Sequence, residues 1–529
     1  MEFASFAGPF VPELLLFAGV LLVFLLDVLG VRRIEVTGGV AVAATLLALL
    51  FVLADLGFAP IAFLATIPSG QIDAVPGSPP PLYSFTTLGF VFQGIFLLAA
   101  FLVSLASMSR PSNERGAPIF YGLLLLATLG MLLVAIASDL IFLLLSIEVT
   151  SISTYLLVAY TRRDVRALEA SMKFYIIGAL STTLSFFGAS LLFGAYGTTN
   201  LFTIRSVAGA VGYPVLVLLG YAFLMAGLAF KATLVPFHAW AVDVYDGAPT
   251  DVTAFLTGAS KKVGLFAFFL VFLGPVLFLA PAAGGSPFSG GTIDLGPIVQ
   301  ITLSVLAVVT MTVGNILALL QKEMKRMLAY SSISQAGYML IGIAIGSSPA
   351  LAGATLQMFA HVFMKTGAFL VVAGVTALGV GPLIDDWKGL GTRRPLLGVA
   401  FGLMLLSLAG VPLTIGFVSK FVLFSSAVQA QGYFVWLAIA GLLNSALSVF
   451  YYARVLKVMF FDRAEAAPLP AGAVVGGSDP PLLPVGGFGY ARAVAVALIA
   501  VAIVAFGVYP QVVLGPIQSA AQHFLAVGA

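Results

Sequence analysis

Five lysines stand in stretches of the sequence that are otherwise apolar: Lys231, Lys261, Lys262, Lys365 and Lys420. An ammonium group at the centre of a membrane-spanning helix costs about 2.5–3.5 kcal/mol on insertion scales, so such lysines face a bundle interior or a hydrated cavity and pair with an acid. Amines and carboxylates held in this way can exchange protons. The lysines therefore predict a site of proton transfer inside a membrane.

Glu148, near the middle of the apolar run at 140–160, is the candidate acidic partner. Removing a lysine from water disfavours its charged form, and a neighbouring carboxylate favours that form again. Movement of the carboxylate can therefore switch the charge of the lysine. The alternative is that the lysines reach the membrane surface along their aliphatic chains. This alternative is strongest for Lys262, because adjacent helical residues point about 100° apart and only one of Lys261 and Lys262 can face a common axis.

Other polar residues in the apolar runs are candidates for connecting the lysines into a relay. They are Ser260, Gln335, Tyr338, His361 and Asn444. Each alone is more often a hydrogen bond between packed helices than a relay. His361 and Lys365 lie four residues apart, hence on one helix face, which favours a relay role for both. His238 and Lys262 are further relay candidates.

The composition predicts the elements that hold these residues. Of 529 residues, 61% are hydrophobic and 9% are charged, and the mean hydropathy is +1.12; a soluble domain would carry roughly 25% charge. Lipid forces the backbone into helices of about 20 residues. We predict an all-α integral membrane protein with about 14 spans. They lie near 10–30, 38–58, 86–108, 117–137, 140–160, 172–195, 213–235, 251–275, 298–319, 327–346, 352–378, 396–430, 433–457 and 490–512.

The composition also limits cofactors and partners. The chain has no cysteine, which excludes disulfides, Cys-ligated iron–sulfur clusters and Cys zinc sites, and its three scattered histidines do not predict a metal centre. The net charge of +3 does not indicate a nucleic-acid partner. The expected surroundings are a lipid bilayer and other membrane proteins.

The positions of Lys and Arg test the count of spans, because basic residues collect in cytoplasmic loops. Of the 24 basic residues, 18 fall in one set of alternate loops, Arg205 alone falls in the other set, and five fall inside spans. This asymmetry predicts that both termini face away from the cytoplasm. The stretch 466–489 is rich in Gly and Pro and predicts a flexible cytoplasmic connection.

Two predicted spans contain helix breaks. Pro236 follows Lys231 in span 7, and Pro412 and Gly416 precede Lys420 in span 12. Proline disrupts a helix, and matched interruptions in two halves of a sequence indicate a transport site. We therefore predict two inverted five-helix repeats, spans 4–8 (117–275) and spans 9–13 (298–457), with helices 7 and 12 broken. A three-helix segment (1–116), a cytoplasmic linker (458–489) and a last span with its tail (490–529) complete the chain. The alternative is that Pro and Gly are simply common in membrane helices.

Four motifs carry a resemblance to a known family. The run Phe230–Leu256 resembles the hallmark of the antiporter-like subunits of respiratory complex I, and Glu148–Tyr155, Lys325–Tyr338 and Gly416–Phe421 are similar to further motifs of that family. The family has three paralogous types. The sequence of Asp243–Thr250 and the lysine at position 420 resemble those of the N type. The resemblance covers the chain from span 4 to span 13.

The resemblance implies a proton-pumping subunit in the membrane arm of a NADH:quinone oxidoreductase, in the inner (plasma) membrane of the cell. Glu148 would match the carboxylate of span 5, Lys231 the lysine of span 7, Lys261 the central lysine of span 8 and Lys420 the exit-side lysine of span 12. Flavin, iron–sulfur clusters, NADH and quinone would belong to partner subunits, with M-, K- and J-like neighbours. No metal, cofactor or redox site is implied in this chain.

Three features depart from the N-type pattern. Asp251 stands where the family usually has proline, Lys262 directly follows the expected lysine, and the pair of His361 and Lys365 is more like the L and Mrp-type subunits. The main alternative function is a subunit of an Mrp-type cation/proton antiporter or of a membrane-bound hydrogenase. A lipid-linked glycosyltransferase would need acidic catalytic residues in its first outer loop, and residues 59–85 offer only Asp73.

Overall fold

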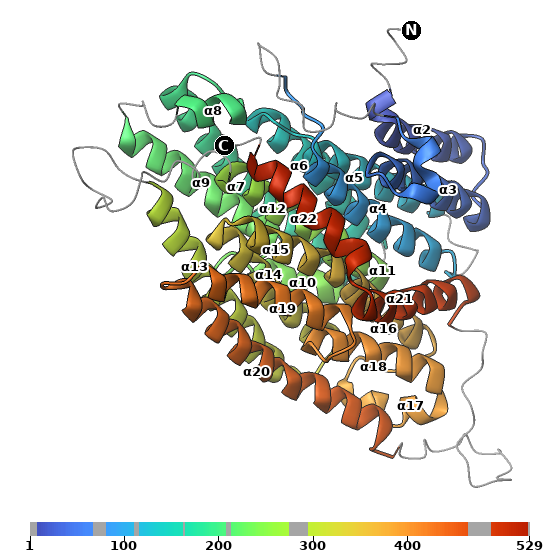
Figure 1. The fold of residues 1–529 in the computed structure, drawn as a ribbon. Helices are drawn as coiled ribbons and strands as arrows, with labels where there is room; N and C mark the ends of the chain where they lie inside the picture. Colours follow the sequence, from blue (N-terminus) through green and yellow to red (C-terminus); the bar gives the residue numbers. More distant parts are fainter. Residues whose placement is uncertain are drawn as a thin grey trace, which may run out of the picture.

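The computed structural model describes residues 8–66, 81–110, 116–161, 164–207, 213–273, 295–463 and 488–526. Within these ranges the regular structure is helical (Figure 1). Thirteen of the described helices are long and apolar enough to cross a membrane. The shorter apolar helices α18 (Pro395–Ala409) and α19 (Ile415–Gln429) together occupy the predicted twelfth span. The all-α membrane architecture is therefore confirmed.

The helices follow the predicted order. Before the first half come η1 (Gly8–Phe10), α2 (Val11–Val28), α3 (Ile34–Asp55), η2 (Ala59–Leu64) and α4 (Thr87–Ser107). The next five spans are α5 (Ala117–Ala135), α6 (Leu140–Val158), α7 (Val165–Tyr196), α9 (Pro214–Ala232) with α10 (Ala239–Gly247), and a composite span of α11 (Thr250–Phe255), η4 (Leu256–Ser260), α12 (Lys261–Phe268) and η5 (Phe269–Leu273). The short helix α8 (Leu201–Val207) lies between α7 and α9.

The second set of five spans, like the first, has its break in the fourth span and a π-turn in one other span. It consists of α13 (Leu295–Leu319), α14 (Met324–Ile345), a composite span of α15 (Ser348–His361), η8 (Val362–Thr366) and α16 (Gly367–Ala377), the pair α18 and α19, and α20 (Phe434–Phe460). The short elements η9 (Ile384–Trp387) and α17 (Leu390–Arg393) precede α18. The last span is α21 (Tyr490–Val508). Most of the predicted linker at 458–489 lies outside the described residues.

Both predicted helix breaks are confirmed. In span 7, α9 ends at Ala232 and Thr233 takes a left-handed conformation with φ of 60°. In span 12, α18 ends at Ala409 and Gly410 is left-handed with φ of 92°. Backbone N–H and C=O groups that lose their helical hydrogen bonds at membrane depth need other hydrogen-bond partners. The Val235 amide finds one in the Thr310 hydroxyl of α13, which accepts its hydrogen bond at 3.1 Å.

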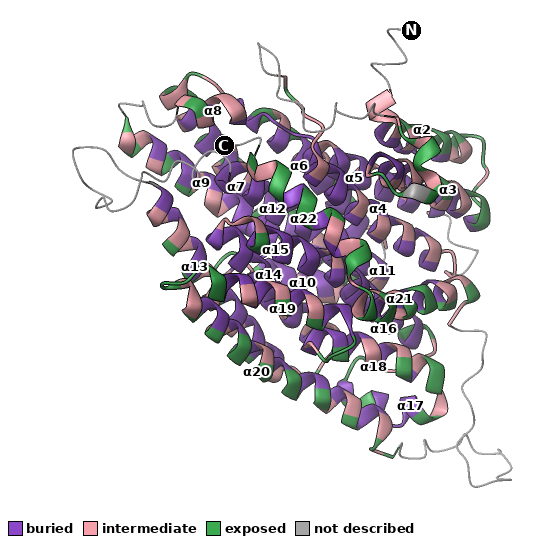
Figure 2. Ribbon diagram, in the orientation of Figure 1, coloured by how far each residue is buried: buried purple, intermediate pink, exposed green. Residues whose placement is uncertain are grey.

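The most buried spans lie where the two sets of helices meet. In the span of α11 to η5 and in α14, 94% of the most apolar window is buried, against 33% in α7 and in α20. Figure 2 shows the same contrast, with buried residues concentrated in the middle of the bundle. The elements η4 and η8 are π-helical turns in two of these central spans, and they pack against each other. The central spans carry Lys261, Lys262 and Lys365.

The end of the chain forms a further helix. In the tail predicted after the last span, Gln511–Ala526 forms helix α22, which packs against α4 and α15. Its buried residues are Leu514, Ile517, Ala520 and Ala521. Their spacing places them on one face of a helix. The predicted tail therefore contains an amphipathic helix that is shorter than a membrane span.

One glycine sets the distance between span 8 and the break in span 7. A Cβ atom on Gly264 of α12 would lie 2.5 Å from the backbone nitrogen of Ala232 and 2.7 Å from the carbonyl carbon of Lys231. No flexible side chain can yield there, since both atoms belong to the backbone. The backbone of Lys231 therefore rests directly on the helix that carries Lys261.

We predict that Gly264→Ala lowers the thermal unfolding midpoint of the purified membrane complex, because the added methyl group forces α12 away from α9. Overpacking of this kind costs about 1–3 kcal/mol. Gly39→Ala in α3 is the matched control, because a Cβ atom there meets nothing within 4 Å. Equal midpoints for the two variants would contradict the close approach.

Candidate functional site

Glu148 and Lys231 line one small cavity between α6, α7 and α9. The cavity measures about 20 Å³, which is room for one water molecule. The Lys231 ammonium donates to the Ser151 hydroxyl at 2.8 Å. The Thr182 hydroxyl donates to the Glu148 carboxylate at 2.5 Å. The acid and the base therefore share a cavity, and a hydroxyl group holds each of them.

Ser151 and Thr182 were not predicted as site residues. Ser151 lies three residues after Glu148, and this spacing places both on one face of α6. That signal was present in the sequence. Thr182 comes from α7 and meets Glu148 across a separation of 34 residues, which no local pattern indicates.

Lys261 and Lys262 follow the π-turn η4 and point to different neighbours. The Lys261 ammonium donates to Ser332 of α14, at 2.5 Å to its carbonyl oxygen and 3.0 Å to its hydroxyl. The Lys262 ammonium donates to the Thr257 carbonyl at 3.1 Å and to the Gly258 carbonyl. It also lies 3.4 Å from Nδ1 of His361.

The alternative that Lys262 reaches the membrane surface is wrong. Its side chain is fully buried, as is that of His361. A π-turn changes the hydrogen-bonding pattern of the helix, and the amine of Lys262 binds two carbonyl oxygens of η4 itself. Two adjacent lysines can therefore both stay inside, one directed toward α14 and one toward α15.

His361 and Lys365 also separate, although their spacing predicted a common face. The Lys365 ammonium donates to the Leu328 carbonyl at 2.9 Å and to the Ser331 hydroxyl, both in α14. His361 instead contacts Lys262. Lys365 lies within the π-turn η8, which begins directly after His361 and changes the angle between the two side chains.

Lys420 binds backbone carbonyl groups at the break in span 12. Its ammonium donates to the carbonyls of Leu408 at 2.8 Å and Ala409 at 3.1 Å, and to the Ser445 hydroxyl at 2.9 Å. It also lies 5.1 Å from the centre of the Tyr338 ring. The two carbonyls are the last of α18, and the carboxyl end of a helix carries partial negative charge. The break itself therefore provides the acceptors for the lysine.

Helix α14 connects these lysines. Its Ser331 and Ser332 bind Lys365 and Lys261. Gln335, one turn later, donates to the Leu408 carbonyl at 3.5 Å, the same oxygen that Lys420 binds. One buried helix thus carries the polar partners of Lys261 and Lys365 and, one turn later, a glutamine that shares a carbonyl acceptor with Lys420.

Side chains from other helices extend this set of polar contacts. Gln357 donates to Gln335 at 2.7 Å, and Ser419 donates to Gln357 at 2.5 Å. Asn315 donates to Tyr338 at 3.4 Å and to the Asn444 side chain at 3.0 Å. Gln335, Tyr338 and Asn444 were predicted, whereas Gln357, Asn315 and Ser419 were missed. Gln357 precedes His361 by four residues on α15, so its helical spacing was a readable signal.

Two predicted relay residues lie apart from this row of contacts. Ser260 is buried in η4. His238 is partly buried at the start of α10, in the break of span 7. Among the described residues, no hydrogen bond joins His238 to a lysine.

The lysines are held mainly by neutral oxygen atoms. Within the part of the chain that the structure describes, none of the ion pairs involves the five predicted lysines. Nor do the described His, Asp and Glu side chains form a group of three or more that could hold a metal ion. A site of this kind can bind, hold and pass protons between amines and hydroxyl groups.

Comparisons with known proteins show which proteins the chain is similar to. The family model described as NADH:quinone oxidoreductase/Mrp antiporter, TM, matches residues 137–448. The chain is 42% identical to F(420)H(2) dehydrogenase subunit N of Methanosarcina mazei over 72% of this chain and 76% of that protein. It is 43% identical to NADH-quinone oxidoreductase subunit N of Trichlorobacter lovleyi over 71% and 74% of the two chains. A chain of respiratory complex I from Thermus thermophilus with bound Aureothin superposes with a TM-score of 0.73 at 29% identity, covering 96% of this chain and 99% of that one.

We predict that Lys262→Leu lowers the thermal unfolding midpoint of the purified complex, because the Thr257 and Gly258 carbonyls lose their buried donor. An unsatisfied buried polar group costs about 1–3 kcal/mol. Lys457→Leu is the control, since Lys457 is exposed at the end of α20. A midpoint for Lys262→Leu at or above that of the unmodified complex would show that the lysine does not satisfy these carbonyls.

Proposed function

The chain belongs to the NADH:quinone oxidoreductase/Mrp antiporter family of transmembrane proteins, and from this premise we propose that it is an N-type, proton-translocating subunit of a NADH:quinone oxidoreductase. It would move protons through a buried relay of Glu148, Lys231, Lys261 and Lys420. The chemistry that drives the relay would take place in partner subunits.

One observation carries the proposal: a single buried helix carries polar groups that contact the lysine of span 8 and the carbonyl acceptor of the lysine of span 12. Lys261 binds Ser332 of α14, and Gln335 of α14 shares the Leu408 carbonyl with Lys420. Hydroxyl groups both donate and accept hydrogen bonds. A row of amines and hydroxyl groups can therefore pass a proton by successive exchange of donor and acceptor roles.

The relay would be driven by repulsion between like charges. Lys261 and Lys365 bind adjacent serines, Ser332 and Ser331. A charge on one amine disfavours a charge on the other, most strongly where the surroundings exclude water. A proton that arrives at one amine therefore favours release of a proton from its neighbour.

The first step would depend on the cavity shared by Glu148 and Lys231. A carboxylate beside the ammonium stabilises the charged lysine, and withdrawal of that carboxylate favours release of its proton. Thr182 holds Glu148 and Ser151 holds Lys231. Movement of either hydroxyl partner would change the strength of the pair, so a small displacement of α6 against α7 could load or empty the relay.

The remaining assignments follow from the same proposal. Flavin, iron–sulfur clusters and quinone would sit in other subunits, and M-, K- and J-like membrane subunits would be the neighbours of this chain. The enzyme activity would be that of the whole complex, a redox-driven translocase of the inner (plasma) membrane. The bias of Lys and Arg would place both termini on the non-cytoplasmic side.

A second candidate function is a subunit of an Mrp-type antiporter or of a membrane-bound hydrogenase. The matching family model includes Mrp antiporters, and the contact between His361 and Lys262 adds a buried group beyond the four relay residues. Mass spectrometry of the intact purified complex separates the candidates. Flavin and iron–sulfur subunits with NADH chemistry would support the first, and either antiporter subunits alone or antiporter subunits with hydrogenase subunits would support the second.

We predict that Lys231→Ala and Glu148→Ala each lower proton translocation by the reconstituted complex about tenfold or more, since positioned acid–base groups contribute at least about 100-fold to proton-transfer rates. Assembly should be retained, because the cavity that holds both residues already has room for water. Glu169→Ala is the control for charge loss, because that side chain is 63% exposed. Full pumping by both relay variants would remove the Glu/Lys mechanism.

We also predict that Thr182→Val causes an intermediate loss of pumping, because Glu148 loses its hydroxyl donor while the volume of the side chain is kept. Hydrogen bonds to charged groups contribute about 1.5–3 kcal/mol. Thr183→Val is the matched control: it is the next residue in α7, and its hydroxyl donates only to the Ala179 carbonyl. The same rate for both variants would mean that Thr182 does not set the state of Glu148.

A further inference from the structure

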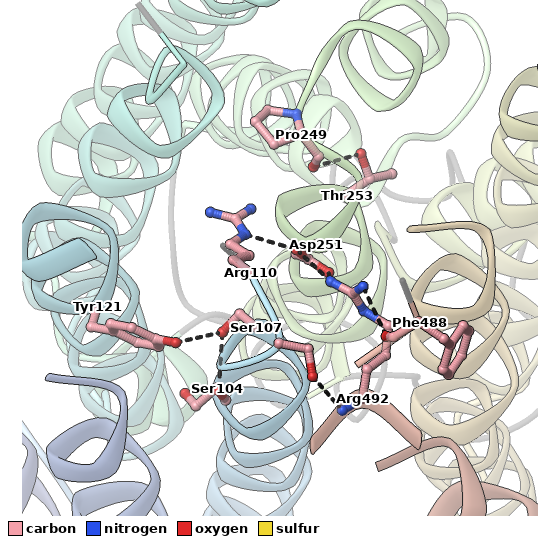
Figure 3. A network of polar contacts seen from close by, with 10 residues as sticks. Ser104, Ser107, Arg110, Tyr121, Pro249, Asp251, Thr253, Phe488 and Arg492 are labelled. Atoms are coloured by element: carbon pink, nitrogen blue, oxygen red, sulfur yellow. Dashed lines mark hydrogen bonds and ion pairs between the residues drawn. The ribbon is translucent and has the colours of Figure 1, made fainter. Parts of the chain in front are cut away.

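Two buried arginine side chains surround the carboxylate of Asp251. Nε of Arg110 donates to Oδ2 of Asp251 at 2.8 Å, and Nη2 of Arg492 lies 3.3 Å from Oδ1 and 3.4 Å from Oδ2 (Figure 3). The side chains of Asp251, Arg110 and Arg492 are only 6%, 10% and 4% exposed. We refer to these three residues as the Asp251 clasp.

The clasp joins parts of the chain that are far apart in sequence. Asp251 lies in the first turn of α11, Arg110 follows α4, and Arg492 lies in the first turn of α21. The two arginines are 141 and 241 residues from Asp251. The backbone amide of Arg492 also donates to the Ser109 hydroxyl at 2.8 Å. Spans 3, 8 and 14 therefore meet at one carboxylate.

Aromatic rings fix one side of the clasp. The guanidinium of Arg110 lies 4.3 Å from the centre of the Phe120 ring and 5.4 Å from that of Tyr160. Cations are attracted to ring faces at such distances. Phe120 belongs to α5 and Tyr160 follows α6. The clasp thus also reaches the two helices that begin the first set of five spans.

A buried cluster of this kind differs from a surface ion pair. Removing one partner leaves a buried charge without compensation, which is far more costly than losing an exposed pair. Asp251 is in addition placed in the first turn of a helix, where a negative charge is favoured. The clasp therefore depends on the carboxylate at position 251.

The helices joined by the clasp are those that pack around the two π-turns. α4 packs against both η4 and η8, and α21 packs against η8 and α16. Span 8 runs from Asp251 through η4 to Lys261 and Lys262 without a further break. A π-turn is an irregularity within an α-helix, and its position determines the direction of every side chain that follows. The start of the span must therefore be fixed for Lys261 to face α14.

We propose that Asp251 is a positioning residue for proton translocation. Held by Arg110 and Arg492, it fixes the start of span 8 against spans 3 and 14. It thereby keeps η4 in the register that directs Lys261 to Ser332 and Lys262 to His361. This inference rests on the proposed function, because the lysines it positions are those of the relay.

The test measures protons moved per electron pair transferred by the assembled complex in sealed vesicles. Asp251→Asn should lower this ratio about twofold or more, within the range that residues coupling distant sites contribute, while electron transfer continues. Asp251→Glu keeps the charge and should restore most of the ratio. Asp243→Asn is the control, because its side chain is 42% exposed and its partners Lys173 and Arg326 lie outside the clasp. A ratio in Asp251→Asn equal to that of the unmodified complex would overturn the proposal. A ratio in Asp251→Glu no higher than that in Asp251→Asn would also overturn it.

If Asp251→Asn does not assemble, Arg492→Gln decides the question, because the pair of Arg110 and Asp251 remains. A lowered ratio in Arg492→Gln supports the clasp, and an unchanged ratio overturns it. Lys231→Ala in the same preparation separates this inference from the proposed function. Full pumping by Lys231→Ala would refute the relay itself, whereas loss in Lys231→Ala with none in the clasp variants would refute the clasp alone.

Discussion

The need to provide oxygen acceptors for buried ammonium groups is the constraint on which the structure depends. The carbonyl groups of a regular α-helix already accept backbone hydrogen bonds, so a lysine inside the bundle must share such a carbonyl or use other acceptors. Lys262 binds carbonyls of the π-turn η4, and Lys420 binds the last carbonyls of α18. Hydroxyl groups serve Lys231 and Lys261. The helix irregularities therefore provide some of the oxygen acceptors that the buried lysines need.

The same constraint explains the central place of α14. This helix is almost wholly buried, yet it carries Ser331, Ser332, Gln335 and Tyr338. Its polar groups contact lysines from spans 8, 11 and 12. A helix of this composition would be poorly accommodated by lipid, because its polar side chains would lack partners. Buried inside the bundle, α14 brings polar partners for the amines of Lys261, Lys365 and Lys420 onto one helix.

The sequence predicted what local composition and spacing determine. Apolar runs predicted the spans, Pro236 and Pro412 predicted the broken helices, and the count of basic residues isolated the five lysines. The π-turns were not predicted, because they depend on packing between spans 8 and 11 and have no residue signature. For that reason the sequence misjudged Lys262 and the face shared by His361 and Lys365. The partners of Asp251 were also not predicted, because they lie 141 and 241 residues away in the sequence.

The most direct test of this account is a density map of the assembled complex in a lipid membrane, at a resolution that reveals ordered water. The account predicts water in the cavity of Glu148 and Lys231 and along α14 between Ser332 and Gln335, with every lysine amine directed to oxygen atoms. Dry apolar packing along α14, with the amines of Lys231, Lys261 and Lys420 extended into the lipid tails, would contradict it.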